Sequence, residues 1–153
     1  MRALIQRVSH AEVSVAGERI AAIGRGVLAL VGVVADDDEA QGLRLVERVL
    51  SYRIFPDGAG RMNLSVTDIA GGLLLVPQFT LAADTRRGNR PGFTTAAEPA
   101  RAHALFEGVA TEARRRLGDR AGALALGRFG ADMQVSLTND GPVTFLLDSR
   151  GSG

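Results

Sequence analysis

Residues 27 to 34 read Val27-Leu28-Ala29-Leu30-Val31-Gly32-Val33-Val34, an apolar run without a polar interruption. Strands that are buried on both faces have this continuous pattern, so we predict a fully buried strand. Directly after it stands Asp36-Asp37-Asp38-Glu39. Acidic side chains cap free N–H groups and favour the positive end of a helix dipole, so this group predicts the start of a helix. The same acids also suggest a cation site, but helix capping explains them better.

Strand patterns lie on both sides of this unit. On the N-terminal side, Met1 to Val15 has strand character, and Arg19 to Ile23 pairs back with it across a turn at Ala16-Gly17-Glu18. On the C-terminal side, a short hairpin is expected from Tyr52 to Leu64, with its turn at Pro56-Asp57-Gly58-Ala59-Gly60. The helix predicted to start at Asp36-Asp37-Asp38-Glu39 has apolar residues spaced by three and four. Its buried face is expected to consist of Leu43, Val46, Val49 and Leu50.

The second half of the chain continues this mixture. An apolar strand from Leu73 to Leu81 precedes a polar loop from Ala82 to Thr95. A second helix is expected to begin near Pro99, a residue suited to the first helical turn, and to stop at Gly118. Its buried stripe is expected to be Ala102, Leu105, Phe106, Val109, Ala113 and Leu117.

The C-terminal third is expected to return to strands. Ala123 to Leu126 has the pattern of a short strand, and Met133 to Thr138 and Val143 to Leu147 flank Asn139-Asp140-Gly141-Pro142 like the arms of a hairpin. Hairpins thus predominate, and regular strand–helix alternation is missing. We therefore predict an α+β fold in which antiparallel or mixed β-sheets form a barrel-like core covered by two main helices.

Length and composition favour one soluble globular domain. The chain has 153 residues, of which 46% are hydrophobic and 23% charged, with a net charge of +1. We place the domain at residues 1–148 and expect a loose tail at 149–153. The longest apolar run, Val27 to Ala35, is too short for a membrane span, and the N-terminus does not have the pattern of a signal peptide. A cytoplasmic location fits these observations.

Several kinds of site are excluded or disfavoured. With no cysteine, the chain can have neither a disulfide framework nor a thiolate nucleophile. His10 and His103 are far apart in sequence and are expected to lie in surface or half-buried positions, so no metal is predicted. No Gly-x-Ser-x-Gly elbow or P-loop occurs. Asp132 and Asp148 have the chemistry of an acid and a base, but nothing in the sequence places them together.

Arginines form two local clusters. All 18 basic residues are arginine. Arg114, Arg115 and Arg116 are best interpreted as a solvated helix face. Arg86, Arg87 and Arg90 lie in a loop that contains Gly, Pro and Asn, and such a loop is able to bind phosphates.

Two segments are unusual for structural elements. In Val76-Pro77-Gln78-Phe79-Thr80-Leu81, proline, glutamine and threonine interrupt an apolar strand, although proline is disfavoured inside a sheet. Taken alone, this segment fits a strand end with a bulge. Asn139-Asp140-Gly141-Pro142-Val143-Thr144 fits an ordinary turn, but a Gly-Pro bond can also be cis at modest cost, about 0.5–1 kcal/mol.

Together these segments resemble the signatures of the D-aminoacyl-tRNA deacylases. Gln78-Phe79-Thr80-Leu81-Ala82-Ala83-Asp84-Thr85 matches one signature, with Arg90-Pro91 at the usual place after it. Ala131 to Leu137 and Asn139 to Thr144 match the other. Further agreement lies at Ala3 to Val8, Arg48 to Phe55, Met62 to Leu64 and Gly127 to Phe129. The sequence departs from the pattern at Pro77, where the family usually has serine, so any role of that hydroxyl is lost.

The resemblance implies a catalytic segment and a reaction. Gln78, Phe79 and Thr80 are expected to line the pocket, where backbone N–H groups near Phe79 polarise the ester carbonyl. The reaction is hydrolysis of the ester of D-aminoacyl-tRNA, with glycine on mischarged tRNA as a further substrate. An aminoacyl ester is already activated, and the neighbouring ribose hydroxyl assists attack by water, so the protein mainly positions and stabilises. No cofactor is implied.

The resemblance also implies substrate-binding residues and partners. We expect a homodimer with sites at the subunit interface, where a cis Gly141-Pro142 pair of one subunit enters the other's pocket and rejects L-amino acids. Arg7 is expected to hold that loop. Met133, Phe129 and Ala131 are expected to border the terminal adenosine or the aminoacyl group. The partners are tRNA and a second copy of the chain, with neither a membrane nor DNA.

Three alternatives remain open from the sequence. Thr80 is a rival nucleophile, although no base is identifiable near it. A non-catalytic RNA-binding protein of the same fold is the main alternative in function, favoured only by the loss of serine at Pro77. A small hydrolase acting on non-RNA esters or amides is the other.

Overall fold

The computed structural model describes residues 1–150, whose centre is a six-stranded mixed sheet. The elements in chain order are β1 (Arg2–Val15), β2 (Glu18–Ile23), β3 (Gly26–Gly32), α1 (Glu39–Ser51), β4 (Phe55–Pro56), β5 (Met62–Leu64), β6 (Gly72–Pro77), the 3-10 helix η1 (Phe79–Ala82), α2 (Pro99–Leu117), β7 (Leu124–Leu126) and β8 (Met133–Asp148). The sheet has the order β2-β1-β3-β6-β7, and β8 pairs with β1. Strands β4 and β5 form a separate small hairpin.

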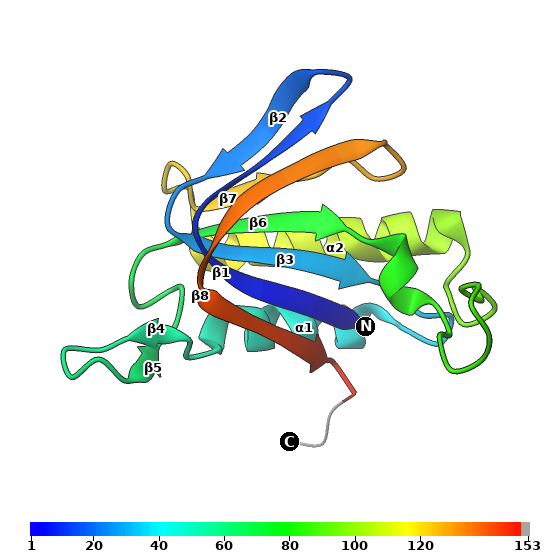
Figure 1. Cartoon of the computed structure of the whole chain (residues 1–153), viewed down its shortest axis with the longest axis horizontal. Helices are drawn as coiled ribbons and strands as arrows, with labels where there is room; N and C mark the ends of the chain where they lie inside the picture. Colours follow the sequence, from blue (N-terminus) through cyan, green and yellow to red (C-terminus); the bar gives the residue numbers. More distant parts are fainter. Residues whose placement is uncertain (151–153) are drawn as a thin grey trace.

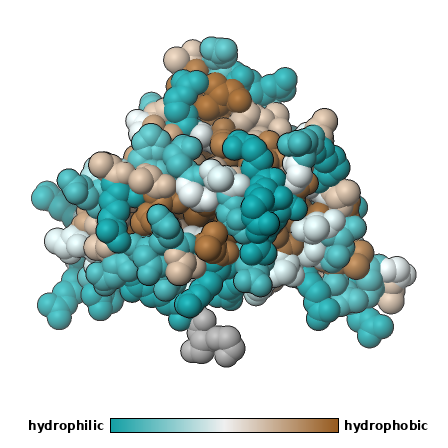
Figure 2. Space-filling view, turned by 180° about the vertical axis from the view of Figure 1, so that it is seen from behind, coloured by the Kyte–Doolittle hydropathy of each residue, from teal (hydrophilic) through white to brown (hydrophobic). Residues whose placement is uncertain are grey.

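The sheet combines antiparallel and parallel pairs. β1 is antiparallel to β2, β3 and β8, whereas β3, β6 and β7 run parallel to one another. The strands curl strongly, and both helices lie behind them in the view of Figure 1. Figure 2 shows the opposite face as mainly hydrophilic, with hydrophobic patches between the polar side chains. The predicted α+β fold with a barrel-like core and two main helices is confirmed.

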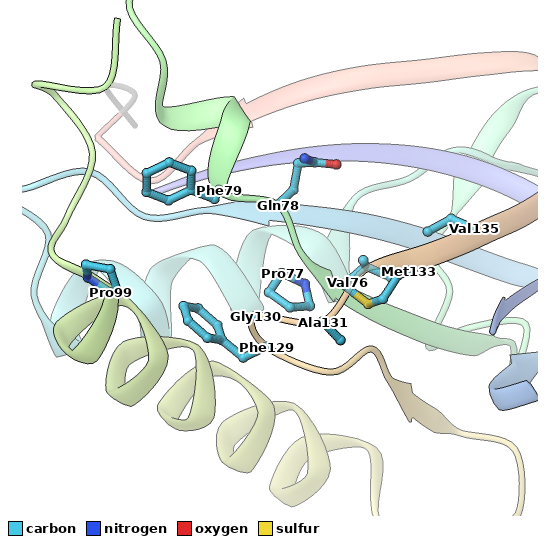
Figure 3. A pocket seen from close by; sticks show the side chains of 10 residues that line it. All are labelled: Val76, Pro77, Gln78, Phe79, Pro99, Phe129, Gly130, Ala131, Met133 and Val135. Atoms are coloured by element: carbon cyan, nitrogen blue, oxygen red, sulfur yellow. The ribbon is translucent and has the colours of Figure 1, made fainter. Parts of the chain in front are cut away.

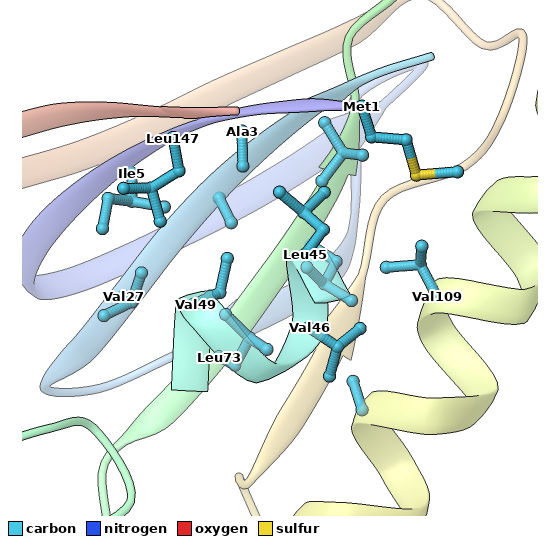
Figure 4. Packing of buried hydrophobic residues seen from close by; sticks show 14 of the residues in the cluster. Met1, Ala3, Ile5, Val27, Leu45, Val46, Val49, Leu73, Val109 and Leu147 are labelled. Carbon is cyan, nitrogen blue, oxygen red and sulfur yellow. The ribbon is translucent and has the colours of Figure 1, made fainter. Parts of the chain in front are cut away.

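The strand predicted from Val27 to Val34 corresponds to β3, Gly26–Gly32, and is buried on both faces, as its continuous apolar run indicated. Val27, Ala29 and Val31 of β3 belong to the core cluster under the two helices. Leu28, between them in sequence, belongs to the second cluster on the other side of the sheet. Figure 4 shows Val27 in the first cluster with side chains of β1, α1 and α2. Alternating side chains of one strand therefore fill two cores, which requires the apolar pattern to be continuous.

The acidic group before α1 has two functions in the fold. Asp38 is the N-cap and accepts a hydrogen bond from the Gln41 N–H at 2.9 Å, as the capping interpretation predicted. Asp37 is instead fully buried, where it accepts from the Met1 ammonium at 2.6 Å and from the Val34 N–H at 2.8 Å. The carboxylate thereby ties the chain's N-terminus to the start of α1.

The predicted loose tail is wrong at Ser149 and Arg150. The Ser149 N–H donates to the Met1 carbonyl at 2.8 Å, and its hydroxyl accepts from the Met1 ammonium at 2.7 Å, so the residue is buried. Arg150 donates to Asp37 at 3.1 Å. These contacts depend on three distant segments meeting in space, which a local pattern does not reveal. Residues 151–153 of the predicted tail lie outside the described residues.

The predicted C-terminal hairpin is also wrong, because Met133 to Asp148 forms one strand, β8. Both halves pair with β1, which is long enough to hold them in sequence. Between the pairs Val8–Asn139 and Gln6–Thr144, residues 140–143 stand opposite Arg7 alone. The Asn-Asp-Gly sequence therefore makes a bulge within a strand instead of a turn between two strands.

Three smaller predictions need correction. Leu43 of α1 is 48% exposed, and Leu45 takes its place in the core. The strand predicted from Leu73 to Leu81 ends at Pro77, where the chain enters η1. Of the predicted strand from Tyr52 to Phe55, only Phe55 pairs, as the first residue of β4. Within residues 1–150, no helix is both long and apolar enough to span a membrane.

Candidate active site

A cavity of about 460 Å³ opens at the end of β6. Five residues expected from the sequence line it, namely Gln78, Phe79, Phe129, Ala131 and Met133. Val76, Pro77, Pro99, Gly130 and Val135 complete the lining. In Figure 3, the Pro77 ring lies between Phe129 and Met133, and Pro99 approaches from the first turn of α2. The cavity therefore joins segments from three separate parts of the chain.

The first wall of the cavity, formed by the end of β6 and the start of η1, is held in place by contacts with β3. Pro77 pairs with Val31, and the Gln78 N–H donates to the Val31 carbonyl at 2.7 Å. The 3-10 turn packs directly against Gly32, since a Cβ there would lie 2.7 Å from the Cβ of Leu81. A residue without a side chain at position 32 thus lets η1 approach the sheet closely.

The opposite wall is the segment between β7 and β8. The Gly127 N–H donates to the Leu75 carbonyl at 2.8 Å, which attaches this segment to β6. A Cβ at Gly127 would lie 3.0 Å from the Met133 sulfur and 3.2 Å from Pro77 Cδ. The Phe129 ring stacks on His103 of α2, with ring centroids 4.6 Å apart and planes 5° apart. His103 thus supports a pocket wall, a contact that sequence reasoning missed because it joins two distant segments.

Polar groups in the cavity are few and belong mainly to Gln78 and to the backbone at the start of η1. The Gln78 side-chain amide donates to the Thr80 hydroxyl at 2.6 Å. The N–H groups of Phe79 and Thr80 stand at the start of the 3-10 helix, where no preceding turn supplies an acceptor. The lining residues include no carboxylate and no histidine. Such a site is suited to hold an apolar group and to donate hydrogen bonds to a carbonyl oxygen.

Four other residues expected at the site lie outside the lining of this cavity, namely Thr80, Arg7, Gly141 and Pro142. Gly141 and Pro142 are exposed in the bulge of β8, and the peptide bond between them is cis. Arg7 donates from Nε to the Asp140 carbonyl at 2.8 Å and from Nη1 to the Ile54 carbonyl at 2.7 Å. The bulge is therefore attached to the sheet from β1.

Asn139 closes the bulge from inside. Its side chain accepts from the Val143 N–H at 2.7 Å and donates to the Val143 carbonyl at 3.0 Å. At Gly141, a Cβ would lie 2.4 Å from Val143 Cγ2, so a larger residue does not fit this backbone. The exposed Gly141-Pro142 pair thus sits on a segment held by hydrogen bonds at both ends.

The other candidates do not form a site. Asp132 directly precedes β8, whereas Asp148 is the last residue of this strand. His10 is exposed on β1. Among residues 1–150, no three His, Cys, Asp or Glu side chains gather in a way that would hold a metal ion.

Comparison with known sequences gives a consistent result. The family described as D-Tyr-tRNA(Tyr) deacylase matches residues 4–148. A protein named D-aminoacyl-tRNA deacylase from Azotobacter vinelandii is 58% identical over 149 residues, which cover 97% of this chain and 100% of that protein. Another of that name, from Alkalilimnicola ehrlichii, is 59% identical over 152 residues, which cover 99% of each.

Solved structures agree on the fold. One titled "c-Myc DNA Unwinding Element Binding Protein" has a TM-score of 0.92 and 38% identity, covering 99% of this chain and 100% of its own. Another, titled "Structural Analysis of a probable eukaryotic D-amino acid tRNA deacylase", has a TM-score of 0.83 and 17% identity, covering 96% and 98%, and shows likeness of fold. Since the family match spans nearly the whole chain and relatives approach 60% identity, the chain belongs to the D-Tyr-tRNA(Tyr) deacylase family of hydrolases.

Proposed function

We propose that this chain hydrolyses the ester bond between a D-amino acid and tRNA, and that residues 1–148 act as one deacylase domain. The observation that carries the proposal is the cavity itself. It gathers Gln78, Phe79 and Met133, which come from the two signature segments, around a hollow large enough for an aminoacyl group and part of a nucleoside. The family match over residues 4–148 supports the same reaction. Because aminoacyl-tRNA is made in the cytoplasm, the cytoplasm would be the site of action of this enzyme.

In the proposed reaction, water attacks the ester carbonyl carbon and the bond to the ribose oxygen breaks. The departing ribose oxygen takes up a proton, and the products are a free amino acid and tRNA. The N–H groups of Phe79 and Thr80 stabilise the negative charge that develops on the carbonyl oxygen. An aminoacyl ester needs no enzyme nucleophile, which fits a cavity without a carboxylate or a histidine among its lining residues.

The proposal includes a homodimer with shared sites. The outer part of β8 carries Phe145 and Leu146, which are 36% and 62% exposed. Gly141 and Pro142 are exposed beside them in sequence and do not line the cavity of their own subunit. A second copy that covers Phe145 and Leu146 would bury this apolar surface and bring its own Gly141-Pro142 pair toward the cavity.

Rejection of L-amino acids is assigned in this proposal to the Gly141-Pro142 segment. A thousandfold selectivity requires about 4 kcal/mol, at 1.36 kcal/mol per decade. A fitting pocket gains about 1–3 kcal/mol per methylene, and mirror-image side chains have equal numbers of methylenes. A steric wall is therefore the more effective device, and the hydrogen bonds that Arg7 donates to Asp140 and that Asn139 donates to Val143 make this one stiff. Glycine has no side chain for the wall to reject, so glycyl-tRNA is a further proposed substrate.

The decisive experiment is deacylation of D-tyrosyl-tRNA and L-tyrosyl-tRNA by the purified protein. The proposal requires rapid release of D-tyrosine and much slower release of L-tyrosine. Equal rates on the two substrates would remove the chiral assignment but leave the hydrolase. No release from either would favour a nucleic-acid-binding role, such as the name of the 38% identical c-Myc DNA unwinding element binding protein gives to that protein. Hydrolysis only of simple esters without RNA would favour the small-hydrolase alternative.

A further inference from the structure

A closed loop connects η1 to α2 and carries three arginines beside the cavity. We define it as the arginine loop, residues 84–92. Its base is closed by two hydrogen bonds, from the Asp84 N–H to the Gly92 carbonyl at 2.7 Å and from the Gly92 N–H to the Asp84 carbonyl at 3.0 Å. Arg86, Arg87 and Arg90 are all exposed on it. The loop is therefore a defined projection with a high density of positive charge.

The three arginines differ in their partners. Arg86 donates twice to the Asp84 carboxylate, at 2.8 Å from Nε and 2.8 Å from Nη2, and holds the pKa of that carboxyl well below its usual range. For Arg87 and Arg90, no carboxylate among residues 1–150 lies within ion-pair distance. An open hollow of about 240 Å³ adjoins Arg90. It is lined by Thr85, Gly88, Asn89, Arg90 and Pro91. Two guanidinium groups are thus left to bind an external anion, and their planar donor sets suit phosphate oxygens.

An aromatic pair links this charge to the cavity. Phe93, just after the loop, stacks on Phe79, with ring centroids 5.0 Å apart and planes 26° apart. Both rings are unusually exposed, Phe79 by 43% and Phe93 by 38%. Phe79 also lines the cavity, so the stack leads from the proposed ester site to the arginine loop. Exposed rings next to unpaired cations are the combination with which proteins bind single-stranded nucleic acid.

We propose that the arginine loop and Phe93 bind the single-stranded 3′ end of tRNA, directly before the aminoacylated nucleotide. Arg87 and Arg90 contact two backbone phosphates, and the face of Phe93 stacks on a base. This inference rests on the proposed function, because the ester-bearing nucleotide must occupy the cavity for its neighbours to reach the loop. An acidic protein segment would satisfy the arginines but leaves the exposed rings without a partner.

The test compares a loop variant with a control of equal charge. The loop variant is Arg87→Gln/Arg90→Gln. The control is Arg44→Gln/Arg114→Gln, which removes two exposed arginines from α1 and α2. Arg114 lies about 22 Å along α2 from the cavity residue Pro99, at 1.5 Å per residue. The probe is a fluorescent ribo-oligonucleotide with the unpaired tRNA 3′ sequence, and its Kd is measured over a range of salt concentrations.

The loop variant is expected to bind the oligonucleotide at least about tenfold more weakly than the control at low salt. Its slope of log K against log salt should decrease by about 1.4, at roughly 0.7 for each lost phosphate contact on a single strand. Phe93→Leu should weaken binding by roughly tenfold with an unchanged slope, because it removes a stacking face and no charge. An equal effect of loop variant and control would overturn the inference. So would competition by polyglutamate as effective as that by RNA of equal charge.

A second measurement separates this inference from the proposed function. Wild-type protein and loop variant are assayed on D-tyrosyl-tRNA and on D-tyrosyl-adenosine, which lacks the preceding nucleotides. The loop variant should raise KM for the tRNA substrate about tenfold and leave hydrolysis of the adenosine ester unchanged. If the wild-type protein hydrolyses neither ester, the proposed function fails, and the oligonucleotide Kd still reports on the loop. If both esters are hydrolysed with unchanged KM in the variant, the loop assignment fails and the function stands.

Discussion

Gln78 and Thr80 are the residues that decide between two chemical mechanisms. The Thr80 hydroxyl accepts a hydrogen bond from the Gln78 amide at 2.6 Å. No histidine or carboxylate among residues 1–150 forms a hydrogen bond with this hydroxyl. A threonine nucleophile needs a base to remove its proton. Its surroundings therefore favour a supporting role for Thr80 and direct attack by water.

Thr80→Ala is expected to retain substantial activity. Loss of one neutral hydrogen bond costs about 0.5–1.5 kcal/mol, which corresponds to a roughly 2- to 13-fold lower rate. Removing a true nucleophile lowers kcat by a factor on the order of a million. Single-turnover release of D-tyrosine from tRNA separates these two ranges. Trapping of an acyl group on Thr80 by rapid acid quench would instead establish covalent catalysis.

Arg7 is expected to govern selectivity more than rate. Its guanidinium holds the carbonyls of Asp140 and Ile54 at once, and lysine cannot reproduce that fixed pair of donors. Arg7→Lys should loosen the bulge, so discrimination between D- and L-tyrosyl-tRNA should decrease by about tenfold, or about 1.4 kcal/mol. Arg19→Lys, at an exposed arginine paired with Glu12, is the control. An unchanged ratio of D to L rates in Arg7→Lys would exclude Arg7 from chiral selection.

Individual residues could be predicted where a signature names them. The sequence indicated Gln78, Phe79, Phe129 and Met133, which line the cavity, and also Thr80, which does not. It did not indicate Pro99, which reaches the cavity only because α2 begins at its rim. The stacking of Phe93 on Phe79 and of His103 on Phe129 could not be predicted from the sequence either, because these contacts join segments that are distant in sequence.

At the scale of elements, segments with one consistent hydrophobic pattern were predicted correctly as strand or helix. The continuous run of β3 and the Pro99 start of α2 both gave the right element. Junctions were not predictable, since a turn signal such as Asn139-Asp140-Gly141 is local whereas the pairing of β8 with β1 is not. Tertiary pairing overrides local preference in sheets. The site lies at such a junction, where β6 passes into η1.

Gly32 of β3 packs against η1, which directly follows β6, and this contact gives a prediction. In Gly32→Ala, the new Cβ would lie 2.7 Å from Leu81 Cβ, so η1 must move away from β3. Overpacking of this kind costs about 1–3 kcal/mol and should lower both Tm and deacylation, because η1 carries the Phe79 N–H. Gly24→Ala is the matched control, as nothing lies within 4 Å of its new Cβ. Equal activity of both variants would show that the position of η1 does not matter for catalysis.

The last turns of α2 give a prediction about ionisation. Hydrogen bonds from Arg115, and then from Arg116, lower the pKa of Glu112 to about 2. Because the pKa in the folded protein is depressed, this contribution to stability is complete above the unfolded value of 4.5 and is lost as the pH falls toward 2. Carboxyl NMR titration of Arg115→Ala/Arg116→Ala should show the Glu112 pKa rising toward 4.5. Arg114→Ala, which removes a neighbouring charge without removing either bond, should leave most of the depression in place.

At the scale of the whole molecule, the two proposed halves of the site lie on different parts of one subunit. The cavity is at the end of β6, and the Gly141-Pro142 pair is in the bulge of β8 and does not line it. This separation has a simple meaning if two subunits exchange these parts around a twofold axis. The fold could be predicted from one sequence, but the proposed shared site would depend on a second copy and was open to inference only through the family resemblance.

Hybrid dimers test the exchange directly. Phe79→Ala damages the cavity, and Pro142→Phe places a large side chain on the exposed bulge. Each variant alone should be nearly inactive on D-tyrosyl-tRNA. In a hybrid, one site combines both defects, but the other combines an intact cavity with an intact bulge. Random mixing at equal amounts makes half of the dimers hybrids, so roughly a quarter of wild-type activity should return. If each site belonged to a single subunit, every site would stay defective and mixing would restore nothing.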